Sequence, residues 1–158
     1  MAWLEALSYI TTILGFPAAI FVFVYERRRS LNNEENELYR NLCEEYDNFL
    51  RLVLDNADLL LLGRTSAPPG LTAEQAERRN IIFMMLISLF EKAYIILYDE
   101  GMGRDARRRW LSWEDDMREW CRKEDFRAAL PGLLEGEDDA FGQHILAIAR
   151  SEGLADSP

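Results

Sequence analysis

The sequence has very few of the side chains that most often bind metals or act as nucleophiles. Its 158 residues include one histidine, His144, and two cysteines, Cys43 and Cys121, which lie far apart. A metal site needs several such side chains at ligand spacing, and glycine-rich phosphate loops, nucleophile elbows and Cys/His pairs are also missing. We therefore expect no metal, no cofactor and no catalytic residue, so the protein is not predicted to be an enzyme. The acids near His144, Asp138 and Asp139, are interpreted as a solvated cap at a helix start and not as metal ligands.

Positive charge is also scarce. The chain has 18 Lys and Arg against 28 Asp and Glu, for a net charge of -10. Nonspecific binding to nucleic acid depends on a surplus of basic side chains that displaces counterions from the phosphates. Nucleic acid is therefore not an expected partner.

Charge is absent altogether from the segment between Ala6 and Tyr25. A membrane-spanning helix needs about 20 apolar residues to cross about 30 Å of hydrocarbon. Trp3 and Tyr25 lie near the two ends, where aromatic rings prefer the lipid headgroup level. A buried core helix seldom stays uncharged for so long and is the weaker alternative.

The flanking charges separate a permanent anchor from a cleaved export signal. A signal peptide carries basic residues before its apolar run, whereas here Glu5 precedes the run and Arg27, Arg28 and Arg29 follow it. We predict that residues 1–29 form a single-pass anchor whose arginines lie at the lipid headgroups. The positive-inside rule places the C-terminal side in the cytoplasm.

Small side chains form a stripe within this predicted span. The stripe is made of Ser8, Thr11, Thr12, Gly15 and Ala19, which recur at helical spacing. Small residues four apart let two helices approach closely in lipid. The stripe either packs against a copy of itself or a partner span, or it reflects the ordinary composition of a lone anchor; the pattern leaves both open.

Glycine and proline are missing from residues 26–62, where apolar residues three, four or seven apart predict one long amphipathic helix. A loop at residues 63–72 ends on Thr72, which together with Gln75 predicts a capping box at the next helix start. No strand-like alternation of useful length is present. The predicted fold is all-α: the N-terminal transmembrane helix continues into a cytoplasmic bundle of about four to five helices, residues 30–153, with a disordered tail at 154–158.

The most apolar stretch outside the anchor covers residues 80–98. Glu91 and Lys92 lie in its middle, where each charge costs about 2.5–3.5 kcal/mol on membrane-insertion scales. We predict a central bundle helix here and no second span. The remaining helix ends are predicted at Asp105, at Asp125 with a stop at Pro131-Gly132, and at Asp138 or Asp139 with a stop at Gly153.

Tryptophan is the most distinctive side chain of the C-terminal third. Trp110, Trp113 and Trp120 share one helix face, and large indole rings usually bury against neighbouring helices. We predict Trp113, Trp120, Phe126 and Phe141 as structural core residues. An alternative uses Arg107, Arg108, Arg109 and Trp110 as a lip that binds an anionic ligand such as a nucleotide, because Arg forks suit phosphate and a Trp ring can stack on a base.

The spacing of the aromatic residues resembles the C-terminal signature of a family of small bacterial membrane-anchored proteins. The residues that carry the resemblance are Trp113, Trp120, Phe126, Arg127, Phe141 and Ile145. Many members have a further Trp after the Phe-Arg pair, where this chain has "AALPGLL". The resemblance implies one N-terminal span in the bacterial inner membrane and a cytoplasmic helical domain of unknown function. It implies no activity and no catalytic residue.

Two functions fit these features. The first is a membrane-anchored interaction or scaffold module without catalysis, with membrane lipid and a membrane protein or a further copy of the chain as partners. The second is a homo-oligomeric membrane effector or pore that assembles through the N-terminal span and is gated by a partner or a nucleotide at the helical domain.

Overall fold

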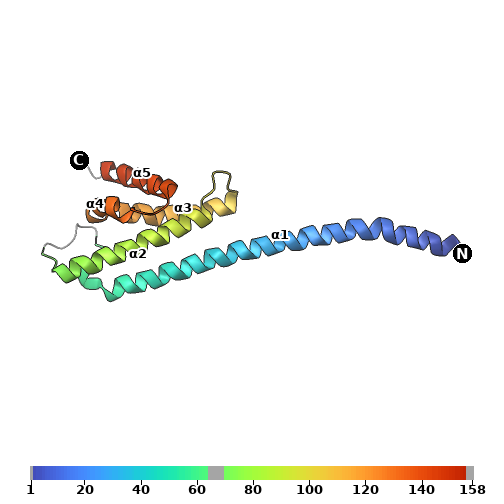
Figure 1. Cartoon of the computed structure of the whole chain (residues 1–158), viewed down its shortest axis with the longest axis horizontal. Helices are drawn as coiled ribbons and strands as arrows, with labels where there is room; N and C mark the ends of the chain where they lie inside the picture. The colour runs from blue at the N-terminus through green and yellow to red at the C-terminus, as the bar shows by residue number, and fades with distance from the viewer. Residues whose placement is uncertain (1, 64–69, 156–158) are drawn as a thin grey trace. The chain divides into compact units, whose positions relative to one another are not determined.

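The protein is all-helical. The computed structural model describes the backbone of residues 2–63 and 70–155, and the side chains within these ranges except at 2–19, 28, 31, 32 and 155. These residues contain no strand. Figure 1 shows the helices in chain order, which are α1 (Ala2–Asp55), the 3₁₀ turn η1 (Ala57–Leu59), α2 (Ala73–Leu97), α3 (Arg104–Cys121), α4 (Glu124–Leu133) and α5 (Asp139–Ala155).

The chain divides into two units, Met1–Arg40 and Asn41–Pro158. The division falls later than the boundary between residues 29 and 30 that the sequence suggests. Residues 33–40 are exposed except for half-buried Tyr39, and Leu42 is the first buried residue among the described side chains of α1. For these side chains, the division of the chain coincides with the point where α1 begins to be buried.

Helix α1 is long because no glycine or proline interrupts its second half, but it ends at Asp55 and does not reach Leu62. The Asn56 side chain donates a hydrogen bond to the Leu52 carbonyl at 2.8 Å, and the Asn56 N–H bonds to the Val53 carbonyl at 3.2 Å. Asn competes with the helix by bonding to nearby backbone in this way. The expected helix over residues 56–62 is therefore wrong, and the 3₁₀ turn takes its place.

Helix α2 begins with the predicted capping box. The Thr72 hydroxyl accepts from the Gln75 N–H at 3.2 Å, and the Gln75 side chain accepts from the Thr72 N–H at 3.0 Å. These two bonds satisfy N–H groups that have no partner within the helix. The capping box is thus confirmed.

Helix α2 packs against α3, α4 and α5, which explains why it is so apolar. Its buried side chains are Ile82, Phe83, Leu86, Ile87, Leu89, Phe90 and Ala93. Among the described residues, α2 is the one helix long and apolar enough to cross a membrane, and 39% of its most apolar window is buried. A core helix has the same length and composition, so this property does not by itself distinguish the two environments.

Three predicted helix ends in α3 and α4 differ from those observed. Helix α3 starts after Gly103 and not at an Asp105 cap. Helix α4 starts after Lys123 and continues through Pro131 to Leu133, and the Leu134 N–H still bonds to the Leu130 carbonyl at 3.0 Å. A proline removes its own N–H from the helix and crowds the carbonyl four residues before it, but the N–H groups after Pro131 remain, so the last turn can still close.

Helix α5 starts as expected but extends further. The Asp138 carboxylate accepts from the Phe141 N–H at 2.9 Å and acts as the cap. The helix passes Gly153 and ends at Ala155. The Arg127 side chain approaches the position that a Cβ on Gly153 would occupy, with its Nε 3.4 Å away. A Cβ at this position would make an ordinary van der Waals contact with the Arg127 side chain, so Gly153 does not have to end the helix.

The core of the helical unit is aromatic. Trp113, Trp120, Phe126 and Phe141 are all buried. The Phe126 ring lies 5.1 Å from the ring of Phe83 on α2 and 5.8 Å from that of Trp120 on α3. Large rings bury much apolar area and prefer tilted contacts of this kind. They join α2, α3 and α4 around one centre.

The same tryptophans join α3 to the last part of α1. The Tyr46 and Phe49 rings lie 5.4 Å from Trp113 and 5.8 Å from Trp120, respectively. The Tyr46 hydroxyl also bonds to the Asp116 carboxylate at 3.2 Å. Aromatic side chains thus attach α1 to the bundle.

Candidate functional site

The predicted packing stripe lies on the N-terminal part of α1. Ser8, Thr11, Thr12, Gly15 and Ala19 belong to this helix, but their side chains are outside the described residues. The stripe therefore stays a prediction. Of the three arginines expected at the headgroups, Arg27 and Arg29 are exposed, and the Arg28 side chain is also outside the described set.

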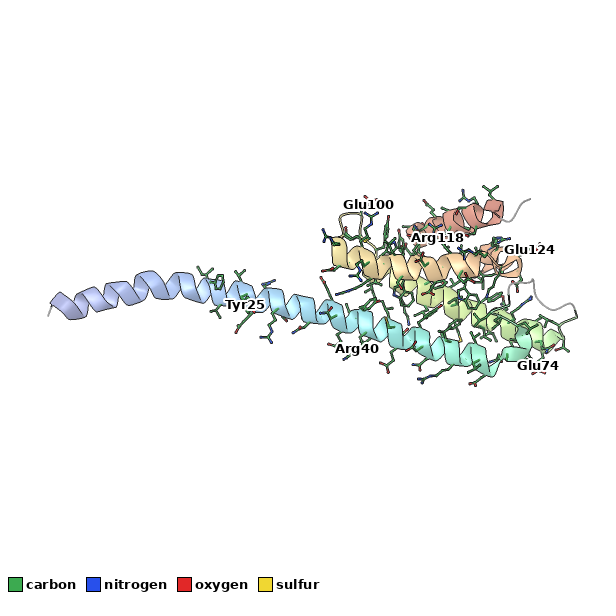
Figure 2. The ribbon with its side chains drawn as sticks, turned by 180° about the vertical axis from the view of Figure 1, so that it is seen from behind. Tyr25, Arg40, Glu74, Glu100, Arg118 and Glu124 are labelled. Atoms are coloured by element: carbon green, nitrogen blue, oxygen red, sulfur yellow. The ribbon has the colours of Figure 1, made fainter. Side chains whose placement is uncertain are left out.

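A continuous apolar girdle precedes these arginines. It consists of Ile20, Phe21, Val22, Phe23, Val24 and Tyr25, whose side chains are each 44–73% exposed. Figure 2 shows side chains projecting outward around Tyr25. Large contiguous apolar surfaces mark contact with a partner or a membrane. This girdle is the exposed end of the uncharged segment.

A second exposed apolar surface lies on α2. Its members are Ile81, Met84, Met85, Ile95 and Ile96, each 41–62% exposed. The sequence does not predict this surface, because α2 is apolar on all sides and periodicity cannot tell which side the bundle leaves uncovered. The signal that could have found it is the pair of exposed polar residues Ser88 and Lys92 within the same face.

A groove of about 400 Å³ lies between the last part of α1 and α2. Its walls include Asn48 and Leu52 from α1 and Met85 and Ser88 from α2. Lys92 and Glu45 form an ion pair of 2.9 Å across it. The groove thus adjoins the exposed face of α2 and combines apolar walls with one charged pair.

Three aromatic rings surround the single histidine and form a cluster with it. Tyr94, Tyr98, Trp110 and His144 make all six pairwise contacts, with centroid distances of 4.8–5.7 Å. His144 is half-buried among them. The exposed Asp138 carboxylate caps α5 as predicted, whereas the His144 ring is turned away from this cap toward α2 and α3.

The surroundings of His144 favour its neutral form. Desolvation by burial lowers its pKa most, Arg118 acts in the same direction, and Glu114 opposes them. Within the described part of the chain, its Nε2 atom has no hydrogen-bond partner. No group of three metal-ligating side chains occurs among the described residues either. The cluster therefore holds His144 as an aromatic packing residue.

The predicted anion lip is only partly assembled. Arg107 lines a depression of about 310 Å³ together with Tyr98, Asp99, Glu100 and Glu114. Trp110 also borders it, but it is 3% exposed and donates through Nε1 to the Glu114 carboxylate at 3.1 Å. Its contacts with Tyr98 and His144 leave little of the ring to stack on a base. Trp110 therefore belongs to the core.

The acids in this depression also oppose an anionic ligand. Asp99, Glu100 and Glu114 line it beside the single Arg107. Arg108 and Arg109 are not among its lining residues; Arg108 is exposed and Arg109 is half-buried. The three arginines therefore do not converge on one site. The three carboxylates also raise the free energy of placing a phosphate there.

An ion network joins α3 to α5. Glu152 accepts from Arg118 at 3.2 Å and from Arg122 at 3.0 Å, and Figure 2 shows Arg118 between the two helices. The hydrogen bond from Arg122 is the main reason that the pKa of Glu152 is lowered. The network is a structural contact.

The Phe-Arg pair of the C-terminal signature is structural as well. The Arg127 guanidinium donates to the carbonyls of Cys121 and Arg122, each at 2.7 Å. Basic side chains stabilise the free carbonyls at a helix C-terminus. Burial raises the pKa of the Cys121 thiol to about 12, which makes it unreactive.

No protein-family model, curated protein or solved structure matches this chain. The features that bear on function are the two exposed apolar surfaces, the girdle on α1 and the face of α2.

Proposed function

We propose that the protein is a single-pass, membrane-anchored interaction module without a catalytic role, with residues 6–25 in the bacterial inner membrane and the helical unit in the cytoplasm. The observation that carries the proposal is the girdle, in which six consecutive apolar residues are exposed at the end of a twenty-residue uncharged segment. The resemblance of the C-terminal residues to a family of bacterial membrane-anchored proteins supports the same location.

The free energy gained by removing apolar side chains from water supports a lipid environment for the girdle. Burying a side chain such as Val, Ile or Phe is worth about 1.5–3 kcal/mol, so six partly exposed ones in water lose several kcal/mol. A helix pairs most of its backbone groups within itself, so a helical segment can span lipid. Exposed Arg27 and Arg29 come after Glu26 at the end of the girdle, at the depth where anionic headgroups attract basic side chains.

The interaction role is proposed for the helical unit. The exposed face of α2 and the groove beside it offer apolar contact area with a polar border of Glu45, Asn48 and Lys92. An apolar centre with a polar rim is the usual arrangement of a protein–protein interface. The module therefore works by contact at this surface.

Fractionation of bacterial cells that express the full chain tests the anchor. The wild-type chain is expected in the membrane pellet after washes with high salt and with alkaline carbonate, and in solution after detergent. A Leu14→Arg, Phe16→Arg double variant, in the middle of residues 6–25, is expected to leave the pellet, because each charge costs about 2.5–3.5 kcal/mol at the centre of a membrane span. Leu154→Arg, at a position that is 76% exposed in the helical unit, is the matched control and stays in the pellet. Recovery of the wild-type chain in the aqueous fraction would refute the proposal.

A second candidate is a homo-oligomeric membrane effector or pore formed by the Ser8, Thr12 and Gly15 stripe. The observation that favours it is the exposed apolar face of α2, which offers a surface for self-association in the helical unit. The mass of the detergent-solubilised full chain separates the two functions. A monomer rules out the pore, whereas a closed ring calls for conductance measurements in planar bilayers, with and without added nucleotide.

A further inference from the structure

The exposed face of α2 carries opposite charges at its two ends. Glu77 and Lys92 are exposed, and Ile81, Met84 and Ser88 follow between them at intervals of three or four residues. Residues at this spacing lie on one side of a helix. The face is therefore a continuous stripe with an acid toward its N-terminal end, a base toward its C-terminal end and apolar side chains between them.

This pattern is complementary to itself when two copies run antiparallel. A twofold axis between Met84 and Met85 places Glu77 of each copy opposite Lys92 of the other, and it places Ile81 opposite the small Ser88. A parallel pair would instead place Glu beside Glu and Lys beside Lys, which is unfavourable. A twofold interface uses the same patch on both subunits, as this stripe allows.

We propose that the exposed face of α2 binds the same face of a second copy of this chain in antiparallel orientation, with Glu77–Lys92 ion pairs at both ends of the contact. The inference builds on the proposed interaction role and identifies the partner as a second copy. It does not use the N-terminal span for the contact.

The charged side chains around the stripe are compatible with this contact. Lys92 pairs with Glu45 across the groove, but the two side chains are 53% and 50% exposed, and an ammonium has three donors, so Lys92 can bond to two carboxylates. The other charges of α2 bind elsewhere: Arg78 with Asp58 and Glu74, and Glu91 with the Asp138 N–H at 2.6 Å.

The contact also includes residues of α1. Met85 and Ser88 belong to the exposed face of α2 and also line the groove, whose other wall includes Asn48 and Leu52 of α1. A contact of this limited extent is weak in dilute solution. Confinement of both copies to one membrane raises their effective concentration and favours pairing.

Charge reversal tests the antiparallel pairing in the full chain. Glu77→Lys places two like-charged pairs in the dimer and is expected to weaken self-association about tenfold, measured as mass against concentration in mild detergent. Adding Lys92→Glu restores opposite charges, and adding Glu45→Lys keeps the ion pair with α1, so the triple variant is expected to dimerise like the wild type. Glu44→Lys, at an exposed position of α1 outside the groove, is the matched control and leaves dimerisation unchanged. Wild-type behaviour of Glu77→Lys, or failure of the triple variant to recover while folded by circular dichroism, would overturn the proposal.

Cross-linking in membranes tests the register. In a Cys43→Ser background, where buried Cys121 remains, Met85→Cys is expected to give a covalent dimer with a short bismaleimide. Ser151→Cys, an exposed site on α5, gives none. Co-expressed, differently tagged Glu77→Cys and Lys92→Cys chains are expected to cross-link to each other, whereas Glu77→Cys alone does not. Cross-links between two Glu77→Cys chains, or none at Met85→Cys, would refute the inference. If the chain stays in the membrane pellet but does not cross-link, only the proposed dimer is refuted. If a dimer is recovered in the aqueous fraction, only the proposed membrane anchor is refuted.

Discussion

Lys123 gives the sharpest test of how the helical unit is held together. Its side chain is 8% exposed at the junction of α3 and α4, and its ammonium donates a hydrogen bond to the carbonyl of Leu61 after η1. The same nitrogen lies 4.1 Å from the centroid of the Trp120 ring. Lys123→Met keeps the aliphatic stem and removes both interactions.

The expected loss follows from these two contacts. A hydrogen bond from a charged donor is worth about 1.5–3 kcal/mol, and a cation–π contact away from water up to about 2 kcal/mol. Desolvation opposes this gain and is the main reason that the pKa of Lys123 is lowered, against the attraction of Glu119 and Asp125. Met also leaves the Leu61 carbonyl without this donor, and a buried acceptor that loses its partner costs about 1–3 kcal/mol. We therefore expect Lys123→Met to reduce the free energy of unfolding by about 2 kcal/mol, or about 8 °C in Tm for a unit of this size.

Lys92→Met is the matched control, because Lys92 is the other of the two lysines in the chain and also forms a polar contact, with Glu45. Its ion pair with Glu45 is half-exposed, and such surface pairs are worth about 0–1 kcal/mol. Guanidinium unfolding of the full chain in mild detergent, followed by tryptophan fluorescence, measures both variants, since three of the four tryptophans lie in α3. Equal losses for the two variants would refute the assigned role of Lys123.

The sign of the pH dependence provides a second check on Lys123. A lowered pKa means that the unfolded chain binds this proton more tightly than the folded chain does. The cost of burying the ammonium is present at neutral pH and disappears as the pH rises through the folded pKa, in the window below about 10.4. The wild type is therefore expected to gain stability relative to Lys123→Met over that window.

Three further predictions concern the interior of the helical unit. Because desolvation lowers the pKa of His144, the wild type is expected to lose stability as the pH falls below about 6.5, whereas His144→Phe removes this part of the slope; parallel slopes in unfolding experiments from neutral to mildly acidic pH would count against a buried neutral ring. The arginine partners of Glu152 lower its pKa, so the stabilisation that Glu152 provides is present above about pH 4.3 and is lost as the pH falls through the folded pKa. Glu152→Gln is expected to reduce the free energy of unfolding by about 1 kcal/mol at neutral pH. No measurable change would show that the network is solvated. Fully buried Phe126 is expected to cost about 3–5 kcal/mol on substitution by Ala, while Leu111→Ala at an exposed site costs far less; similar denaturation midpoints for the two would contradict the aromatic core.

Much of the fold could be predicted because its signals are local. The helical periodicity and the capping box of Thr72 and Gln75 depend on side chains within a few turns of one another, and so does the shared helix face that marked Trp113 and Trp120 as core residues. The positions of most helix ends could not be predicted to the residue. Asn56 ends α1 and Arg127 binds the last carbonyls of α3 through particular hydrogen bonds, and several polar residues near each end could have done the same.

By itself, the sequence determined that the chain is helical, where the bundle's apolar side chains lie, and that residues 6–25 carry no charge. Only the tertiary structure decided which side of the uniformly apolar α2 is left uncovered, and that Trp110 and His144 share one ring cluster. The physical reason is that an apolar side chain is buried only when another helix covers it. Which helix does so depends on contacts between residues far apart in the chain.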